Sequence, residues 1–234
     1  MICKIADLFT EIPEERGYAP LLQEYTVEEK EAADIVVDAR YYRYDKYAGF
    51  SKDIVAYIES GAQFHHWLLH FGGMMLHASA VELDGRAYLF SGPCGMGKST
   101  HTRLWQREFP EARIFNDDKP ALRRIDGRWF AYGTPWSGKN HININMKASL
   151  AGICFLKRGE KNSIRRLSAD EAITRLIHQT MRVFRKEADL DLMLSMVEQL
   201  ATEIPIYELH ALADVAAARL SYETMRRGAE EAGL

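Results

Sequence analysis

Features that mark membrane, secreted and nucleic-acid-binding proteins are missing from this sequence. No apolar run approaches the roughly 18 residues that a membrane-spanning helix needs, and no charged-then-apolar leader opens the chain. The net charge of −3 gives no electrostatic reason to expect nucleic acid or an anionic membrane as a partner. The sequence therefore predicts a cytoplasmic protein that binds neither.

Cysteine is also scarce. The chain has three, Cys3, Cys94 and Cys154, which are too few and too scattered for a disulfide framework or a zinc cluster. No repeat or low-complexity segment is present, and an apolar content of 47% in 234 residues is ordinary for a globular protein with a buried core. This length allows one large domain, or one domain with a sizeable extension.

The sequence does contain a complete phosphate-binding loop at residues 92–99, in the pattern G-x-x-x-x-G-K-[ST]. The glycines of such a loop let several backbone N–H groups converge on one anion, the lysine reaches the β- and γ-phosphates, and the hydroxyl ligates Mg²⁺. Residues 89–91 can end a strand, and the residues after the loop can begin a helix whose positive end faces the phosphates. The pattern predicts a nucleotide held by Gly92, Pro93, Cys94, Gly95, Met96, Gly97, Lys98, Ser99 and Thr100.

Two Asp-Gly pairs predict hairpins around this loop. Asp84-Gly85 separates the strand-like runs 76–83 and 86–91, since both central positions of such a turn need positive φ. Asp126-Gly127 joins runs 122–125 and 129–132 in the same way. The phosphate-binding loop thus follows an antiparallel hairpin, which favours a fold built on a mixed sheet.

Acidic and basic side chains follow the predicted strands. Residues 113–118 form a short apolar strand ending in Asp117 and Asp118, and a strand that delivers a carboxylate beside a phosphate-binding loop completes the Mg²⁺ site of such proteins. A solvated turn is the alternative. The loop 133–140 is rich in small, polar and basic groups and carries Lys139 as a further candidate cation.

The first seventy residues carry few chemical signals. Runs 3–9 and 35–37 are strand candidates, residues 51–71 have the apolar spacing of a helix, and a tyrosine-rich run at 41–47 is predicted as a loop. His65, His66 and His70 invite a metal site, but no carboxylate or cysteine stands beside them at helical spacing. We therefore favour an amphipathic helix over zinc binding.

The C-terminal part is predicted to be scaffold. A strand is expected over 150–156, a capping box at Ser168 and Glu171 begins a helix running to about Phe184, and a second helix covers 190–202. A strand over 204–209 and a last helix follow, with Gly228 as the candidate C-cap.

Three signals in this order resemble the HPr kinase/phosphorylase superfamily, whose cores are related to phosphoenolpyruvate carboxykinase. They are the run 77–81 (HASAV) before the first hairpin, the loop 92–99, and the run 116–118 (NDD). The resemblance covers roughly residues 75–160, with the strand at 204–209 fitting the C-terminal part. It implies an α/β phosphate-loop kinase core over 73–234, with a mixed, hairpin-containing sheet flanked by helices, and a smaller α+β extension over 1–72.

The resemblance also implies roles for single residues. Lys98 and the loop amides hold the β- and γ-phosphates, Ser99 ligates Mg²⁺, and Asp117 matches the metal-associated carboxylate. Asp118 matches the carboxylate that takes the proton of the acceptor hydroxyl, and His77 matches a histidine that orients an aspartate or the acceptor. The two aspartates are adjacent, so an exchange of their roles stays open.

This chain departs from the family after the double aspartate. The glycine- and arginine-rich signature of true HPr kinases has no clear counterpart, and residues 134–140 occupy that place, with Lys139 as the cation that neutralises the moving phosphoryl group. The resemblance therefore supports phosphoryl transfer more strongly than it supports HPr as the substrate.

The sequence thus predicts a kinase that uses ATP, or another NTP, with Mg²⁺. The acceptor is a hydroxyl of a serine in a peptide or protein, or of a small-molecule alcohol. The alternatives are an NTPase or switch without an acceptor, and a nucleotide-sensing binding protein. The acceptor's identity and the oligomeric state, a homo-oligomer included, stay open.

Overall fold

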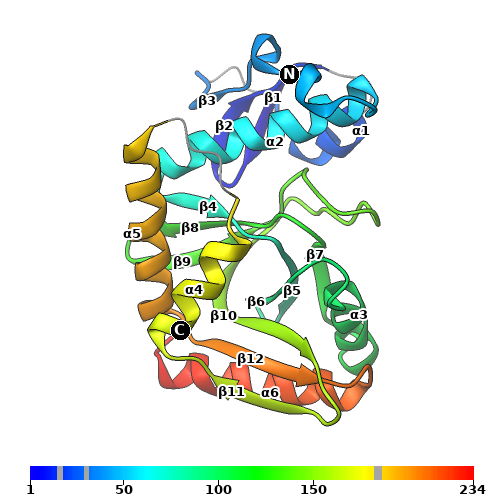
Figure 1. The fold of residues 1–234 in the computed structure, drawn as a ribbon, viewed down its shortest axis with the longest axis vertical. Coiled ribbons are helices and arrows are strands. Elements are labelled where there is room, and N and C mark those ends of the chain that lie inside the picture. Colours follow the sequence, from blue (N-terminus) through cyan, green and yellow to red (C-terminus); the bar gives the residue numbers. More distant parts are fainter. Residues whose placement is uncertain (15–17, 29–31, 182–185) are drawn as a thin grey trace.

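The computed structural model describes residues 1–14, 18–28, 32–181 and 186–234. A small N-terminal part lies against a larger α/β body (Figure 1). In the N-terminal part, β1 (Ile2–Ile5), β2 (Leu8–Glu11) and β3 (Ile35–Val36) form a three-stranded sheet in that order. The predicted single strand over 3–9 is wrong, because Ala6 and Asp7 take φ values of 51° and 61° and turn the chain into a hairpin.

Short helical turns and one long helix complete this part. The short ones are α1 (Ala19–Leu22), η1 (Gln23–Tyr25), η2 (Ala39–Tyr41) and η3 (Tyr44–Tyr47), so the tyrosine-rich run forms 3-10 turns. The helix predicted over 51–71 is confirmed as α2 (Lys52–His70), and its N-cap Ser51 accepts a hydrogen bond from the Ile54 N–H at 3.3 Å. Within the described ranges, none of the helices combines the length and apolar character that crossing a bilayer requires.

The body is built on a nine-stranded sheet. Its strands are β4 (Gly73–Met75), β5 (Ala78–Leu83), β6 (Arg86–Ser91), β7 (Arg113–Asn116), β8 (Ala121–Ile125), β9 (Arg128–Tyr132), β10 (Lys147–Arg158), β11 (Ser163–Arg166) and β12 (Ile206–Ala211). The order is β4-β8-β9-β10-β6-β5-β7, with β12 also paired to β10 and β11 paired to β12. The pairs β6–β10 and β10–β12 are parallel and the other pairs antiparallel, which confirms the mixed sheet.

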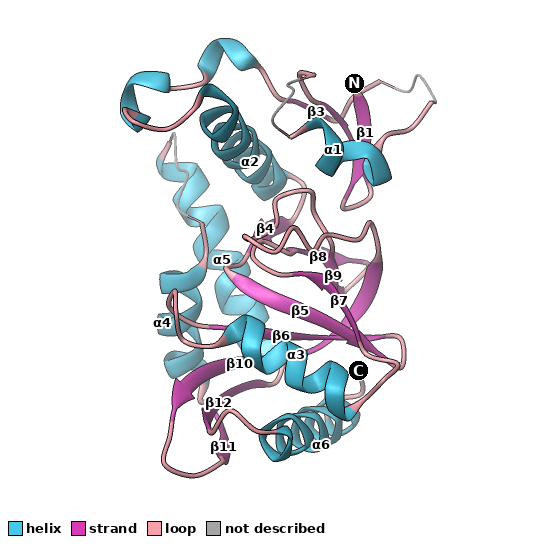
Figure 2. Ribbon diagram, turned by 90° about the vertical axis from the view of Figure 1, so that its right-hand side faces the viewer, coloured by secondary structure: helices cyan, strands magenta, loops and turns pink. Residues whose placement is uncertain are grey.

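Helices cover both faces of this sheet (Figure 2). Alternate residues of β6 point to opposite faces. Tyr88 and Phe90 pack in one core with Trp105 of α3 (Lys98–Glu108) and Met225 of α6 (Val215–Glu231). Leu89 packs in the other core with side chains of α4 (Ala169–Gln179) and α5 (Glu187–Glu203). The long central strands are therefore buried on both sides.

Two helix ends differ from the sequence prediction. The capping box at Ser168 and Glu171 is confirmed, but α4 ends at Gln179, and Phe184 lies outside the described residues. The predicted C-cap at Gly228 is wrong, since α6 runs on to Glu231. A Cβ at Gly228 would collide with the Tyr207 hydroxyl, so this glycine permits close packing inside the helix.

The N-terminal part packs on the body through α2. The indole of Trp136, from the loop 133–140, stacks on Phe64 with ring centroids 4.8 Å apart and donates to the Ser60 hydroxyl at 3.1 Å. The Tyr57 hydroxyl donates to the Ser137 carbonyl at 2.6 Å. These contacts fix the loop 133–140 against α2, while a domain boundary between residues 72 and 73 stays a prediction.

Candidate functional site

The register of three strands brings the predicted site residues to one edge of the sheet. Ala78, at the start of β5, pairs with Ser91, at the end of β6, and Ala80 pairs with Asn116, at the end of β7. His77, the loop 92–99 and the run 116–118 leave these strand ends directly. Antiparallel pairing of β5 with both neighbours therefore places residues from three separate runs of sequence side by side.

The loop 92–99 curls over the start of α3. Gly92, Gly95 and Gly97 have φ values of 148°, 78° and 104°, which side chains other than glycine rarely adopt. The Lys98 side chain is buried, and its ammonium donates to the Gly92 carbonyl at 2.9 Å. Burial lowers the pKa of Lys98 from its usual value, and the charge of Asp118 opposes that shift. The lysine is thus held by the loop and close to the aspartates.

Asn116 shapes the turn that carries both aspartates. Its side-chain oxygen accepts hydrogen bonds from the N–H groups of Asp118 at 3.0 Å and Lys119 at 2.7 Å. Its amide nitrogen donates to the Thr134 carbonyl at 3.0 Å. This fully buried amide makes an Asx turn, a local alternative to a backbone turn, and ties it to the loop 133–140.

Asn116→Ala is expected to destabilise the protein by roughly 1–3 kcal/mol, the cost of leaving buried polar groups without partners. The free energy of unfolding in urea measures this. Gln106→Ala, at an exposed position on α3, should stay within about 0.5 kcal/mol of the parent chain. Equal stability of both variants would contradict a structural role for the Asn116 amide.

Asp117 is buried and faces the loop 133–140. Its Oδ1 accepts from the Gly138 N–H at 2.5 Å, and its Oδ2 accepts from the Asn140 side chain at 3.1 Å. A Cβ at Gly138 would lie 3.0 Å from the Asp117 carboxylate, so glycine allows this close approach. The carboxylate is fixed in place, and each oxygen retains a second lone pair.

Asp118 lies in a chain of polar side chains. Its Oδ1 is 3.2 Å from the His77 Nε2, and its Oδ2 accepts from the Lys119 ammonium at 3.0 Å. The Nδ1 of His77 is 3.1 Å from the side-chain oxygen of Gln179, at the end of α4. Burial raises the pKa of the Asp118 carboxyl, but the His77 hydrogen bond and the Lys119 charge outweigh it and hold that pKa below its usual value. Asp118 is therefore ionised at neutral pH.

These groups line one cleft of about 500 Å³. Of the predicted site residues, it brings together His77, Cys94, Gly95, Gly97, Lys98, Ser99, Thr100, Asp117, Asp118 and Lys139. Gly92, Pro93 and Met96 line a neighbouring cavity of about 400 Å³ instead, together with Arg175, His178 and Gln179. Both hollows are lined by residues of the loop 92–99.

Sequence reasoning missed residues that support this cleft. Arg103 lines it and donates to the Asn140 side chain at 3.0 Å, so α3 is tied to the loop 133–140. Gln179 contacts His77, and Tyr57 reaches Ser137 beside the cleft. Gln179 and Tyr57 come from helices distant in sequence, and none of the three residues belongs to a motif that would have singled it out.

The oxygen atoms in the cleft suit Mg²⁺, which prefers hard oxygen ligands and retains waters. The Ser99 hydroxyl stands in the first turn of α3, and the Asp117 carboxylate lines the same cleft. Loop N–H groups and the helix start favour phosphate at this place. The donor set thus fits a magnesium-bound nucleotide.

The comparisons with known proteins leave the family undecided. No protein-family model matches the chain, and no curated protein matches its sequence. Among solved structures, the chain is similar to the HPr(Ser) kinase/phosphatase from Coxiella burnetii, with a TM-score of 0.37 and 11% sequence identity. That match covers 67% of this chain and 95% of the other. The case for a function rests on the residues of the cleft.

Proposed function

We propose that this chain is a kinase that uses ATP and Mg²⁺ to phosphorylate a hydroxyl group. The observation that carries the proposal is the convergence of the phosphate-binding loop with Asp117, Asp118 and His77 in one cleft. A phosphate cradle alone would fit any nucleotide-binding protein. A fixed, ionised carboxylate beside the cradle adds a group that can orient an acceptor hydroxyl.

The phosphate end of ATP is assigned to the loop amides and the Lys98 ammonium. Ser99 and Asp117 would hold Mg²⁺, whose chemistry when bound is to neutralise charge on the β- and γ-phosphate oxygens. Lys139 and Arg103 also line the cleft and supply further positive charge there. Positioning and charge neutralisation account for most of the catalysis of phosphoryl transfer, and these side chains supply both.

Asp118 is the residue proposed to orient the acceptor hydroxyl and to take its proton. The acceptor oxygen forms a bond to the γ-phosphorus, the bond from that phosphorus to the bridging oxygen breaks, ADP leaves, and the hydroxyl proton passes to the Asp118 carboxylate. A carboxylate with a lowered pKa is a weak base at pH 7, so it chiefly orients the hydroxyl and takes the proton late. His77, held by Gln179, keeps Asp118 in position.

The N-terminal part is the proposed place of acceptor recognition. Tyr57 of α2 lies beside the cleft, where burial and then the charge of Asp118 raise the pKa of its hydroxyl. Its hydroxyl therefore stays protonated at neutral pH and keeps its hydrogen bond to the Ser137 carbonyl, next to Gly138 of the cleft. The acceptor proposed is a peptide, protein or small-molecule alcohol that enters the cleft beside Gly138 and Lys139 of the loop 133–140.

Cys94 offers a chemical probe of the cleft. It is exposed in the phosphate-binding loop, whereas Cys3 and Cys154 are buried and burial raises the pKa of both thiols. A thiol-alkylating reagent should inactivate the protein, ATP with Mg²⁺ should protect it, and Cys94→Ser should resist. Mass spectrometry of the peptide holding residues 92–98 identifies the modified thiol, and modification that ATP does not slow would contradict a nucleotide at this loop.

The proposed function is tested by ADP formation with candidate acceptors. A kinase forms ADP at a rate that rises with an acceptor hydroxyl and yields one phosphorylated product per ADP. ADP formation that no acceptor changes would indicate an NTPase or switch. Tight ATP binding with no turnover in any acceptor mixture would indicate a nucleotide-sensing protein.

A further inference from the structure

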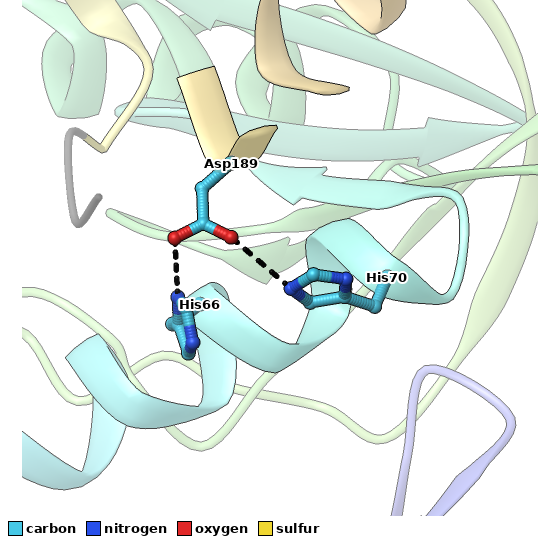
Figure 3. Close-up of side chains that lie close together, drawn as sticks. All are labelled: His66, His70 and Asp189. Atoms are coloured by element: carbon cyan, nitrogen blue, oxygen red, sulfur yellow. Dashed lines mark ion pairs between the residues drawn. The ribbon is translucent and has the colours of Figure 1, made fainter. Parts of the chain in front are cut away.

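The fold brings a carboxylate to the histidines of α2. His66 and His70 lie one turn apart on this helix, and Asp189, from the first turn of α5, lies across from them (Figure 3). Asp189 Oδ2 is 3.5 Å from the His66 Nδ1, and its Oδ1 is 3.2 Å from the His70 Nε2. The sequence around the histidines has no carboxylate at helical spacing, and a helix distant in sequence supplies one. His65 takes no part in this cluster, because its Nε2 hydrogen-bonds with the Met181 carbonyl.

We propose that His66, His70 and Asp189 bind a divalent transition-metal ion of the zinc class. Two imidazoles and one carboxylate form a donor set typical of zinc sites with an open coordination position. This donor set differs from the two oxygen ligands proposed for Mg²⁺ in the cleft, Ser99 and Asp117. The proposed site is therefore separate from the nucleotide chemistry.

The geometry agrees with such an ion. A tetrahedron with metal–ligand bonds of about 2.0–2.1 Å has edges of about 3.3 Å between its ligand atoms. Each imidazole nitrogen lies close to that edge length from one of the two carboxylate oxygens, His66 Nδ1 at 3.5 Å from Oδ2 and His70 Nε2 at 3.2 Å from Oδ1. With one ligand atom taken from each residue, the three atoms all lie within 4.8 Å of one another. These separations are short enough for one ion to contact all three residues.

The exposure of the three side chains also suits a bound metal ion. The side chains of His66 and Asp189 are only 7% and 2% exposed, so two ligands are shielded from competing water. His70 is 40% exposed, which leaves a path for the ion and for a water in the fourth position. Asp189 Oδ2 also accepts from the Lys186 N–H at 3.0 Å, which fixes the carboxylate at the start of α5.

Cobalt titration of the full-length, metal-stripped chain in the absence of nucleotide tests the proposal. One Co²⁺ per chain should bind and give the strong visible absorption of a four-coordinate ion, which Zn²⁺ then abolishes by displacement. The Trp67 ring lies 5.2 Å from the His66 ring and 6.0 Å from the His70 ring, so Co²⁺ should quench its fluorescence. Trp67→Phe should lose the quenching and keep the absorption.

Two variants decide which residues hold the ion. His70→Ala and Asp189→Asn should each weaken Co²⁺ binding by more than about 10–100-fold, the loss that removing an outer partner of a ligand already causes. Asp189→Asn keeps an acceptor for the Lys186 N–H, and His70→Ala alters a half-exposed side chain, so circular dichroism should show both folded. His178→Ala, at an exposed position on α4, and Ser99→Ala should bind as the parent chain does.

Other results would overturn the proposal. Absence of stoichiometric Co²⁺ binding, or binding that both His70→Ala and Asp189→Asn retain, would leave His66, His70 and Asp189 as ion pairs that join α2 to α5. Loss of absorption in Ser99→Ala alone would place the ion in the cleft instead.

Discussion

Lys98→Ala should reduce nucleotide turnover by roughly 10²–10³-fold, the usual effect of removing one preorganised charge or donor from a reacting centre. Lys98 is held inside the loop 92–99, the proposed phosphate-binding loop, where its ammonium donates to the Gly92 carbonyl. No backbone N–H can replace its charge beside the phosphates. Isothermal calorimetry with ATP and Mg²⁺ should show weakened binding, and ADP formation should fall in parallel.

A matched lysine provides the control for this result. Lys161, between β10 and β11, is exposed, and Lys161→Ala should leave both ATP affinity and turnover unchanged. Normal ATP affinity and normal turnover in Lys98→Ala would contradict the proposal that the loop 92–99 binds the nucleotide.

The two adjacent aspartates should respond differently to loss of charge. Asp118→Asn should leave ATP binding near normal while transfer falls by roughly 10²–10⁴-fold, the usual contribution of a general base. Asp117→Asn should raise the Mg²⁺ concentration needed for half-maximal activity, since Asp117 is the proposed metal-associated carboxylate. Steady-state kinetics at several Mg²⁺ concentrations separate the two effects.

Either of two outcomes would revise these roles. A raised Mg²⁺ requirement in Asp118→Asn, with slow transfer in Asp117→Asn, would exchange the assignments. Full activity in both variants would reduce the run 116–118 to a structural turn. Asp170→Asn, on the exposed first turn of α4, should change neither quantity and serves as the control.

The elements best predicted from sequence are those specified by local patterns. Asp84-Gly85 and Asp126-Gly127 demand positive φ, and the structure has φ of 54° and 49° at the two aspartates. Such turns fix which strands pair, so the mixed sheet followed from the hairpins. The single strand over 3–9 failed because Ala6-Asp7 is an unusual pair for a tight turn and gives no signal of that kind.

The features of the site that the sequence did not predict depend on contacts between segments far apart in the chain. His77 contacts Gln179 across 102 residues, and Tyr57 contacts Ser137 across 80. The carboxylate facing His66 likewise arrives on another helix, so the histidine pattern alone argued against a metal site. Gly228 looked like a helix end because glycine is common there, whereas packing against Tyr207 explains it.

The central claim is phosphoryl transfer to a hydroxyl in this cleft, and γ-labelled ATP tests it most directly. The parent chain, incubated with an extract of its source cells, should transfer label to one class of hydroxyl-bearing molecule. Asp118→Asn and Lys98→Ala should transfer little, while Lys161→Ala should transfer as the parent does. Label released only as inorganic phosphate, or equal transfer by Asp118→Asn, would contradict the account.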